Sequence, residues 1–167
     1  IARRFNNFYG DVFPEPQPKL TRSARLPGTD GRKMSKSYGN DIQMTESPES
    51  IRKKVMPMMT DPARMRRSDP GDPEKCPVFD FHRTFSGDED RDWVVEGCTS
   101  AGIGCVDCKK KLLENMLPVI EPLHSKRVEL ERNLDYVKDV LVDGSRQARE
   151  VAGKTMEEVR SSLNLDY

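Results

Sequence analysis

Residues 107–141 read DCKKKLLENMLPVIEPLHSKRVELERNLDYVKDVL, and this stretch decides the fold class. Its apolar residues recur every three or four positions, which is the period of one face of an α-helix. They are Leu113, Met116, Leu117, Ile120, Leu123, Leu130, Leu134, Val137 and Leu141. The spacing predicts a long helix that Pro118 and Pro122 kink or split. Asp143-Gly144-Ser145 is predicted to end it and to cap a second helix. That helix carries Ala148, Val151, Ala152, Met156, Val159 and Leu163 on one face.

Shorter helices are predicted upstream of this stretch. Ser47-Pro48-Glu49 is typical of a helix start, with a capping hydroxyl, a proline in the first turn and an acid at the positive end of the helix dipole. Pro57 is expected to end that helix near Met56. Asp88-Glu89-Asp90 predicts another helix start. Strand signal is weak, with Lys19–Leu26 as the best candidate, so the chain is predicted to be mainly α.

The chain has 167 residues, of which 35% are hydrophobic and 34% charged. This length predicts one domain, or one domain and part of another. The apolar runs are only a few residues long, so we expect no membrane-spanning segment and a cytoplasmic location. The sequence starts at Ile1 and lacks an apolar secretory stretch, and we expect it to be part of a longer protein.

Charge is balanced overall but unevenly distributed, with 28 basic and 28 acidic residues. Residues 19–67 contain 12 basic and 5 acidic side chains, whereas residues 68–100 contain 3 basic and 9 acidic ones. A basic block favours a polyanionic partner. Two solvated faces of opposite charge would explain the same pattern.

A polar, glycine-bounded loop at residues 27–40 contains Lys33-Met34-Ser35-Lys36-Ser37. Two ammonium groups three residues apart can converge on one anion when such a loop folds tightly, and hydroxyls and free backbone N–H groups can add donors. A compact lysine charge suits phosphate oxygens whose charge grows during a reaction. The pattern therefore indicates a polyphosphate clamp, with an ordinary solvated loop as the alternative.

This pentapeptide and its surroundings resemble the class I aminoacyl-tRNA synthetases. Lys33–Ser37 matches the second catalytic motif of that family, KMSKS, in full. Other segments resemble the bacterial tryptophanyl-tRNA synthetases, and together they extend over nearly the whole chain. They are Arg4–Gly10, Thr60-Asp61-Pro62, Asp69–Glu74 and Gly144–Ala152.

The resemblance implies a fold and an activity. Residues 46–167 would form a helical tRNA anticodon-binding-type domain with a four-cysteine metal site. Residues 1–45 would be an irregular loop region from the C-terminal edge of a Rossmann-type catalytic domain. The enzyme would be a tryptophan–tRNA ligase, which activates tryptophan with ATP and Mg²⁺ and then transfers it to tRNA(Trp).

It also implies roles for residues of the loop. Lys33 and Lys36 would be catalytic, because they would neutralise the leaving pyrophosphate. Ser35 and Ser37 would hydrogen-bond phosphate or hold the loop. Met34 and, nine residues before Lys33, Ala24 would lie beside the adenosine. Together, the ATP-binding residues would be Ala24, Lys33, Met34, Ser35, Lys36 and Ser37.

One family motif is missing from the chain. The histidine-rich HIGH motif has no match, because the only histidines are His82 and His124, and neither has that context. The resemblance therefore implies the C-terminal half of the enzyme, inactive alone and bound to ATP and tryptophan through an N-terminal half. The full-length enzyme is expected to be a homodimer. The competing hypothesis is a non-catalytic RNA-binding helical module with a structural metal site.

Four cysteines lie close together in the sequence: Cys76, Cys98, Cys105 and Cys108. The pair Cys105-Val-Asp-Cys108 is a common metal-chelating turn. Four thiolates suit Zn²⁺ or a [4Fe–4S] cluster, with four reduced cysteines as the remaining alternative. Some bacterial tryptophanyl-tRNA synthetases hold a [4Fe–4S] cluster at nearly this spacing, so the resemblance favours the cluster, with zinc as the alternative.

Two basic segments remain without an assigned partner. Lys109-Lys110-Lys111 is expected to contact tRNA or to be a solvated first helical turn. Arg64, Arg66 and Arg67 are expected to meet tRNA or solvent. His82 and His124 are expected to be structural.

Overall fold

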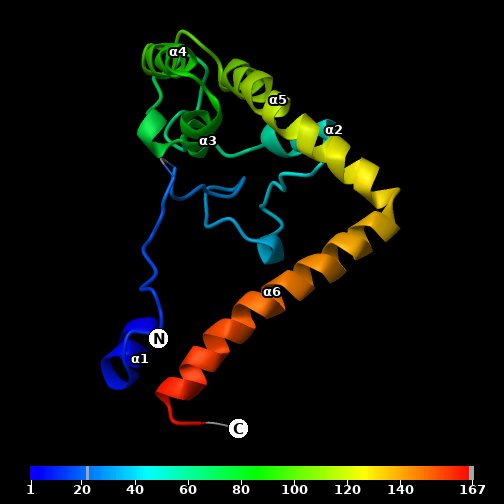
Figure 1. Cartoon of the computed structure of the whole chain (residues 1–167). Helices are drawn as coiled ribbons and strands as arrows, with labels where there is room; N and C mark the ends of the chain where they lie inside the picture. Colours follow the sequence, from blue (N-terminus) through cyan, green and yellow to red (C-terminus); the bar gives the residue numbers. More distant parts are fainter. Residues whose placement is uncertain (22, 166–167) are drawn as a thin grey trace. The chain divides into compact units, whose positions relative to one another are not determined.

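The computed structural model describes residues 1–21 and 23–165, which form helices joined by irregular loops (Figure 1). The α-helices are α1 (Ala2–Tyr9), α2 (Pro48–Val55), α3 (Pro77–Phe85), α4 (Asp88–Thr99), α5 (Cys105–Glu131) and α6 (Leu134–Ser162), with 3-10 helices η1 (Lys36–Tyr38) and η2 (Pro73–Lys75). The predicted mainly helical class is confirmed. In the described ranges, no helix is both long and apolar enough to cross a membrane.

The prediction of a strand at Lys19–Leu26 is wrong for its described residues, which form no regular structure. Residue 22 of that segment lies outside the described part of the chain. An isolated antiparallel bridge joins Pro27 to Lys33 instead. A lone strand has no neighbour with which to pair its backbone groups, so a short β-like stretch does not persist as a strand here.

Backbone contacts divide the chain into two compact units. One comprises Ile1–Lys19 and Leu130–Tyr167, and the other comprises Leu20–Glu129. The second unit contains the loop at 27–40, the four cysteines and the main core. The predicted division between residues 45 and 46 stays a prediction.

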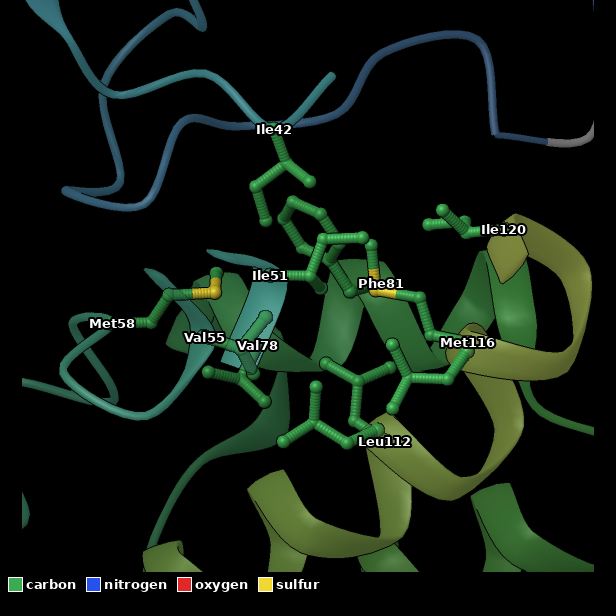
Figure 2. Packing of buried hydrophobic residues seen from close by; sticks show 11 residues of the cluster. Ile42, Ile51, Val55, Met58, Val78, Phe81, Leu112, Met116 and Ile120 are labelled. Atoms are coloured by element: carbon green, nitrogen blue, oxygen red, sulfur yellow. The ribbon is translucent and has the colours of Figure 1, made fainter. Parts of the chain in front are cut away.

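The core of the second unit is a cluster of apolar side chains from α2, α3, α5 and the loop after Asn40 (Figure 2). Its buried members are Ile42, Ile51, Val55, Met58, Val78, Phe81, Leu112, Leu113, Met116, Leu117 and Ile120. Figure 2 shows Phe81, Ile51 and Met116 meeting in its centre. Burial of this apolar surface is the main free-energy gain that fixes α2, α3 and α5 to one another.

Two predicted helix starts are confirmed. The Ser47 hydroxyl accepts a hydrogen bond from the Ser50 N–H (3.2 Å), and Pro48 begins α2, which ends at Val55. Helix α4 begins at Asp88, with three acidic residues in its first turn. Both starts depend on groups within one turn of the helix end, which is why local sequence reveals them.

Pro118 and Pro122 do not split the long helix. Helix α5 continues through both prolines, as its ribbon in Figure 1 also shows. Both prolines are exposed and lie four residues apart, so they share one face of the helix. The buried residues Leu112, Met116 and Ile120 hold the helix from another face. Packing therefore outweighs the two backbone hydrogen bonds that the prolines cannot donate.

The predicted helix end at Asp143-Gly144-Ser145 is also wrong. Helix α6 runs without a break from Leu134 to Ser162, and its N-cap is Asn133, whose side chain accepts from the Tyr136 N–H (3.3 Å). Asp143 instead pairs with Arg146 one turn later (2.6 Å). A single glycine costs a helix only about 1 kcal/mol, which the surrounding turns can offset.

Candidate functional site

Asn40 holds the loop at residues 27–40 together from the inside. It is buried, and its side-chain NH₂ donates to Asp30 Oδ1 (2.7 Å) and to the Lys33 carbonyl (3.2 Å). Its side-chain oxygen accepts the Ser35 N–H (2.8 Å). One side chain therefore fixes the backbone on both sides of Met34.

Close approach of the backbone to Asn40 requires a glycine. Gly28 donates its N–H to the Arg32 carbonyl (2.7 Å), and a Cβ on Gly28 would lie 2.3 Å from Asn40 Nδ2. Any larger residue at this position would expel the Asn40 side chain. Gly31 turns the chain with a φ of +78°, a conformation that other residues adopt only with strain.

The loop is anchored to the core at its base. The Thr29 N–H donates to the Asn40 carbonyl (2.9 Å), and the Thr29 carbonyl accepts from the Met59 N–H (3.0 Å). Met34 packs against the apolar cluster. The base of the loop is therefore held in place, while its outer residues remain accessible.

The charged and hydroxyl groups of the loop face solvent. Lys33 and Lys36 are exposed, and neither ammonium group has an ion-pair or hydrogen-bond partner among residues 1–21 and 23–165. The hydroxyls of Ser35 and Ser37 are 2.8 Å apart and share one hydrogen bond. Two cations and two hydroxyls are thus available to an anion from solution.

Asp30 balances part of this positive charge. The hydrogen bond from the Asn40 amide, supported by the guanidinium of Arg32, lowers the pKa of Asp30 to about 2. Arg32 pairs with Asp30 (2.6 Å) and lies over the Tyr38 ring, 5.0 Å from its centre. Arg32 is therefore held by the protein.

Ala24 and the loop border different hollows. Lys33 and Met34 line a hollow of about 580 Å³ together with Arg25 and Asp80. Ala24 lines a second hollow of about 300 Å³, which Arg25 and Asp80 also border. Ser35, Lys36 and Ser37 line neither of these two hollows. Ala24 therefore lies across a shared wall from Lys33 and Met34, whereas Ser35, Lys36 and Ser37 lie outside both hollows.

The four cysteines come from three separate segments. Cys76 is the N-cap of α3, Cys98 lies in the last turn of α4, and Cys105 and Cys108 lie in the first turn of α5. The turn after α4 returns the chain to α5, with Ala101 at a φ of 59°. The Cys98 carbonyl accepts the Gly71 N–H (2.9 Å), which ties the preceding loop to the same place.

These thiols lie within electrostatic reach of one another. Burial, together with smaller contributions from Cys76, Cys98 and Cys105, raises the pKa of Cys108 to about 12. Burial also raises the pKa of Cys76 and of Cys98, with added contributions from neighbouring cysteines. For Cys76, Cys98 and Cys108, partial burial and the neighbouring sulfurs therefore favour the thiol form in the metal-free chain.

Arg64 is buried beside this group rather than exposed to solvent or RNA. Its guanidinium donates to the Ile103 carbonyl (2.7 Å), to the Arg67 carbonyl (2.9 Å) and to Cys98 Sγ (3.7 Å). The Arg64 Nε atom is buried and has no hydrogen-bond partner in the described ranges. Both sequence-based expectations for Arg64 are therefore wrong, and its positive charge is directed at a sulfur.

His82 approaches the group from the other side. Its ring is fully buried in α3, and its Nε2 atom lies 3.4 Å from Cys108 Sγ and 3.2 Å from the Cys108 carbonyl oxygen. Arg64 and His82 have no sequence signal of their own, because they are 12 residues before and 6 residues after Cys76. The packing of α3 against α5 brings His82 to Cys108, and the loop before η2 brings Arg64 to Cys98 at the end of α4.

Lys109 is likewise neither a solvated residue nor a contact available to RNA. It is buried, and its ammonium group donates to the carbonyls of Met56 (2.8 Å) and Met58 (2.7 Å). It thereby satisfies the carbonyl of Met56, which caps the end of α2, and the carbonyl of Met58 in the turn that follows. Lys110 and Lys111 are not buried.

By donor type, four sulfurs with hydrogen-bond donors beside two of them suit a zinc ion or an iron–sulfur cluster. Within residues 1–21 and 23–165, however, no three His, Cys, Asp or Glu side chains are arranged so that they could hold a metal ion. The structure therefore brings the four cysteines into one region without forming a ligand cage.

The family model that matches the chain is described as tRNA synthetases class I (W and Y), and it covers residues 1–119. The chain is 55% identical to a tryptophan–tRNA ligase of Thermotoga maritima over its full length and 51% of that protein. It is 49% identical to the enzyme of the same name from Aquifex aeolicus, with 99% of the chain and 42% of that protein covered.

A solved structure is similar to the chain as well. The tryptophanyl-tRNA synthetase of Campylobacter jejuni, crystallised with ADP and tryptophan, matches with a TM-score of 0.73 and 28% identity over 98% of the chain and 51% of that protein. This chain belongs to the class I tRNA synthetases, in the bacterial-type tryptophanyl-tRNA synthetase family. It spans about half the length of the relatives that it matches.

Proposed function

We propose that this chain is the C-terminal half of a tryptophan–tRNA ligase and carries its phosphate-handling loop. The observation that supports this most strongly is the loop at residues 27–40. Asn40 pins it from inside, while the ammonium groups of Lys33 and Lys36 have no partner in the part of the chain that the structure describes. An enzyme that must release pyrophosphate needs such cations in a fixed place. Membership of the class I tRNA synthetases supports this class of reaction.

In the proposed reaction, the tryptophan carboxylate attacks the α-phosphate of ATP, and pyrophosphate leaves with Mg²⁺. Lys33 and Lys36 neutralise the negative charge that grows on the leaving phosphates. Ser35 and Ser37 donate hydrogen bonds to phosphate or to each other, and Ala24 and Met34 border the adenosine. Because the base of the loop is anchored and its outer residues are accessible, the loop can close over ATP.

The catalytic role of the loop is tested by the substitution Lys36→Ala in the whole protein of which this chain is part. Loss of a charge that acts mainly in the transition state should cost about 2–4 kcal/mol, or roughly 30- to 900-fold in ATP–pyrophosphate exchange. The affinity for tryptophan should change little. A matched control is Lys53→Ala, because Lys53 is exposed on α2 and pairs with Glu49 (2.7 Å). Equal turnover in the two variants would refute the role.

The remaining parts of the proposal concern the partners. Residues 46–167 serve as an anticodon-binding-type domain for tRNA(Trp), and residues 1–45 as the edge of the catalytic domain. The N-terminal half, with its HIGH motif, supplies the tryptophan pocket, so the 167-residue chain alone should show no exchange activity. The whole enzyme acts in the cytoplasm as a homodimer. Full exchange activity from this chain alone would contradict this division of labour.

We also propose that Cys76, Cys98, Cys105 and Cys108 hold a [4Fe–4S] cluster, with zinc as the alternative. Support comes from the mutual electrostatic influence of the four thiols and from the donors at Cys98 and Cys108. When bound, the group would join α3, α4 and α5 covalently through their sulfurs, and such ligation adds to folding free energy. The role is structural.

The metal proposal is tested on protein purified without oxygen. An ultraviolet–visible spectrum and quantification of iron and zinc are recorded for the same sample. Broad brown absorption with about four irons per chain supports the cluster, and a colourless sample with about one zinc supports the alternative. Cys108→Ser should abolish binding, whereas the control Val106→Ser, at an exposed site in the same helical turn, should not. A wild-type chain with neither metal would contradict the proposal.

A further inference from the structure

A chain of polar side chains runs from the acidic first turn of α4 to the cysteine region. Its successive distances are 2.7 Å from Asp90 Oδ2 to Asn115 Nδ2, 3.0 Å from Asn115 Nδ2 to Ser86 Oγ, 2.7 Å from Ser86 Oγ to His82 Nδ1, and 3.4 Å from His82 Nε2 to Cys108 Sγ. His82 and Ser86 are buried. Every link joins groups from different turns or helices, so this chain exists only in the folded protein.

The carboxylate at the outer end sets the direction of the hydrogen bonds. An ionised Asp90 can only accept, so the Asn115 amide must turn its NH₂ group toward it. The Lys111 ammonium lies 3.9 Å from the other oxygen of Asp90 and forms an ion pair with it. The second hydrogen of the same NH₂ group is then donated to the Ser86 hydroxyl.

The same reasoning assigns the donor and acceptor roles of Ser86 and of the His82 imidazole. The Cys108 carbonyl, 3.2 Å from His82 Nε2, can only accept, so Nε2 carries a hydrogen; the Ser86 hydroxyl, which receives the Asn115 hydrogen at its oxygen, keeps its own hydrogen for Nδ1. A nitrogen that accepts carries no proton, so the proton of the neutral ring is on Nε2.

We propose that the Asp90–Asn115–Ser86 chain holds His82 as the Nε2–H tautomer, so that His82 donates to Cys108 Sγ and positions this sulfur for metal binding. The Nε2 hydrogen is shared with the Cys108 carbonyl, because the two acceptors lie 3.2 and 3.4 Å away. The positioning role rests on the proposed metal site, whereas the tautomer and the contact with sulfur do not. Donors of this kind fix the orientation of a ligand and reduce its charge at the metal.

The tautomer can be measured by ¹⁵N NMR on the metal-free 167-residue chain labelled at histidine. The second histidine is an internal comparison, because His124 Nδ1 lies 3.0 Å from the Thr45 carbonyl, which can only accept, so this Nδ1 must carry a proton. The variant His124→Gln assigns the signals. The expected spectrum shows His82 protonated at Nε2 and unprotonated at Nδ1. A proton on Nδ1 of His82 would overturn the proposal.

The contact with sulfur is tested in the same spectrum. Cys108→Ala removes the sulfur and keeps the carbonyl, so the Hε2 proton of His82 should shift upfield and exchange faster with water. The control is Cys105→Ala, which removes a neighbouring thiol that has no recorded hydrogen bond to His82. Unchanged His124 signals report that each variant is folded. If the shift and the exchange rate of Hε2 are the same in Cys108→Ala as in the wild type, the carbonyl is the sole acceptor and the proposal is wrong.

The positioning role is tested on chain loaded with iron and sulfide. The amide nitrogen of His82→Gln can reach the place of Nε2, whereas that of His82→Asn reaches only the place of Nδ1. Iron retention should stay near wild type in the first variant and weaken roughly 10- to 100-fold in the second. Equal loss in both would refute positioning by Nε2. A wild-type chain that takes up neither iron nor zinc refutes the metal site and this role, but not the tautomer.

Discussion

Replacement of Asn40 by alanine should loosen the lysine loop without disturbing the core. Asn40 is buried and holds the Ser35 N–H (2.8 Å) and the Lys33 carbonyl (3.2 Å). Alanine removes both hydrogen bonds and leaves these backbone groups to find water. The apolar cluster is untouched, because Asn40 is not one of its members.

The expected cost follows from these two backbone hydrogen bonds. Each is worth about 0.5–1.5 kcal/mol, so together they contribute about 1–3 kcal/mol. The third hydrogen bond of Asn40, to Asp30, adds little to this cost, because water can take its place at the carboxylate. If the loop opens locally, its opening equilibrium should shift roughly 5- to 160-fold.

Hydrogen exchange measured residue by residue by NMR is the appropriate assay, since it reports local opening free energies. Protection of the Ser35 amide should fall roughly 5- to 160-fold, whereas protection of the Met116 and Ile120 amides in α5 should change little. In the whole enzyme, the same variant should lower the rate of ATP–pyrophosphate exchange, because Lys33 and Lys36 would be less fixed.

The control is Asn7→Ala, which removes an exposed asparagine from α1. It should leave exchange at Ser35 unchanged. If Asn40→Ala also leaves the Ser35 amide within about twofold of wild type, the idea that Asn40 pins the loop is wrong, since the lost hydrogen bonds must appear in the opening free energy.

Three further predictions concern pH and stability. The folded-state pKa of Asp30, about 2, lies below its usual value of 3.8. The ionised carboxylate therefore stabilises the fold above pH 3.8, and this contribution to the free energy of unfolding is lost as the pH falls toward 2. In acid titration, Asn40→Ala should lose less unfolding free energy over this pH range than the wild type. Gly144→Ala should stabilise the chain by about 1 kcal/mol in urea unfolding, because Gly144 is inside α6 with open space around it, and destabilisation would indicate a helix end there. Lys109→Met should destabilise by about 1–3 kcal/mol, since two carbonyls lose a charged donor, whereas the control Lys110→Met should change the unfolding free energy by less than about 0.5 kcal/mol.

The sequence predicted helices correctly where the signal is local. Ser47 caps the start of α2 and Asp88 begins α4, because a capping hydroxyl and an acidic first turn act on atoms within one turn. Pro118 and Gly144 misled the prediction. Each disfavours a helix by itself, but the helix around it is long, and neighbouring turns outweigh a local cost of a few kcal/mol or less.

Some residues of the candidate site could also be found from the sequence, whereas others could be found only from the structure. The residues of the loop, Lys33–Ser37, are adjacent in sequence, so the motif was visible without a structure. The residue that pins the loop, Asn40, was not, because its role depends on the approach of Gly28 and Asp30 from the other side of the turn. Family membership followed from the motif and its flanks, and the comparisons confirmed it.

By itself, the sequence determined the helical class, two helix starts and the family. It also revealed the two groups of residues that could bind ligands or take part in catalysis, which are the lysine loop and the four cysteines. Tertiary structure alone decided that Arg64 and Lys109 are buried rather than exposed, and that the histidine expected to be structural, His82, lies beside a cysteine sulfur. The physical reason is range. Caps, turns and motifs act over a few neighbouring residues, whereas the surroundings of a buried polar group come from segments far apart in the chain, which only the packing of the core brings together.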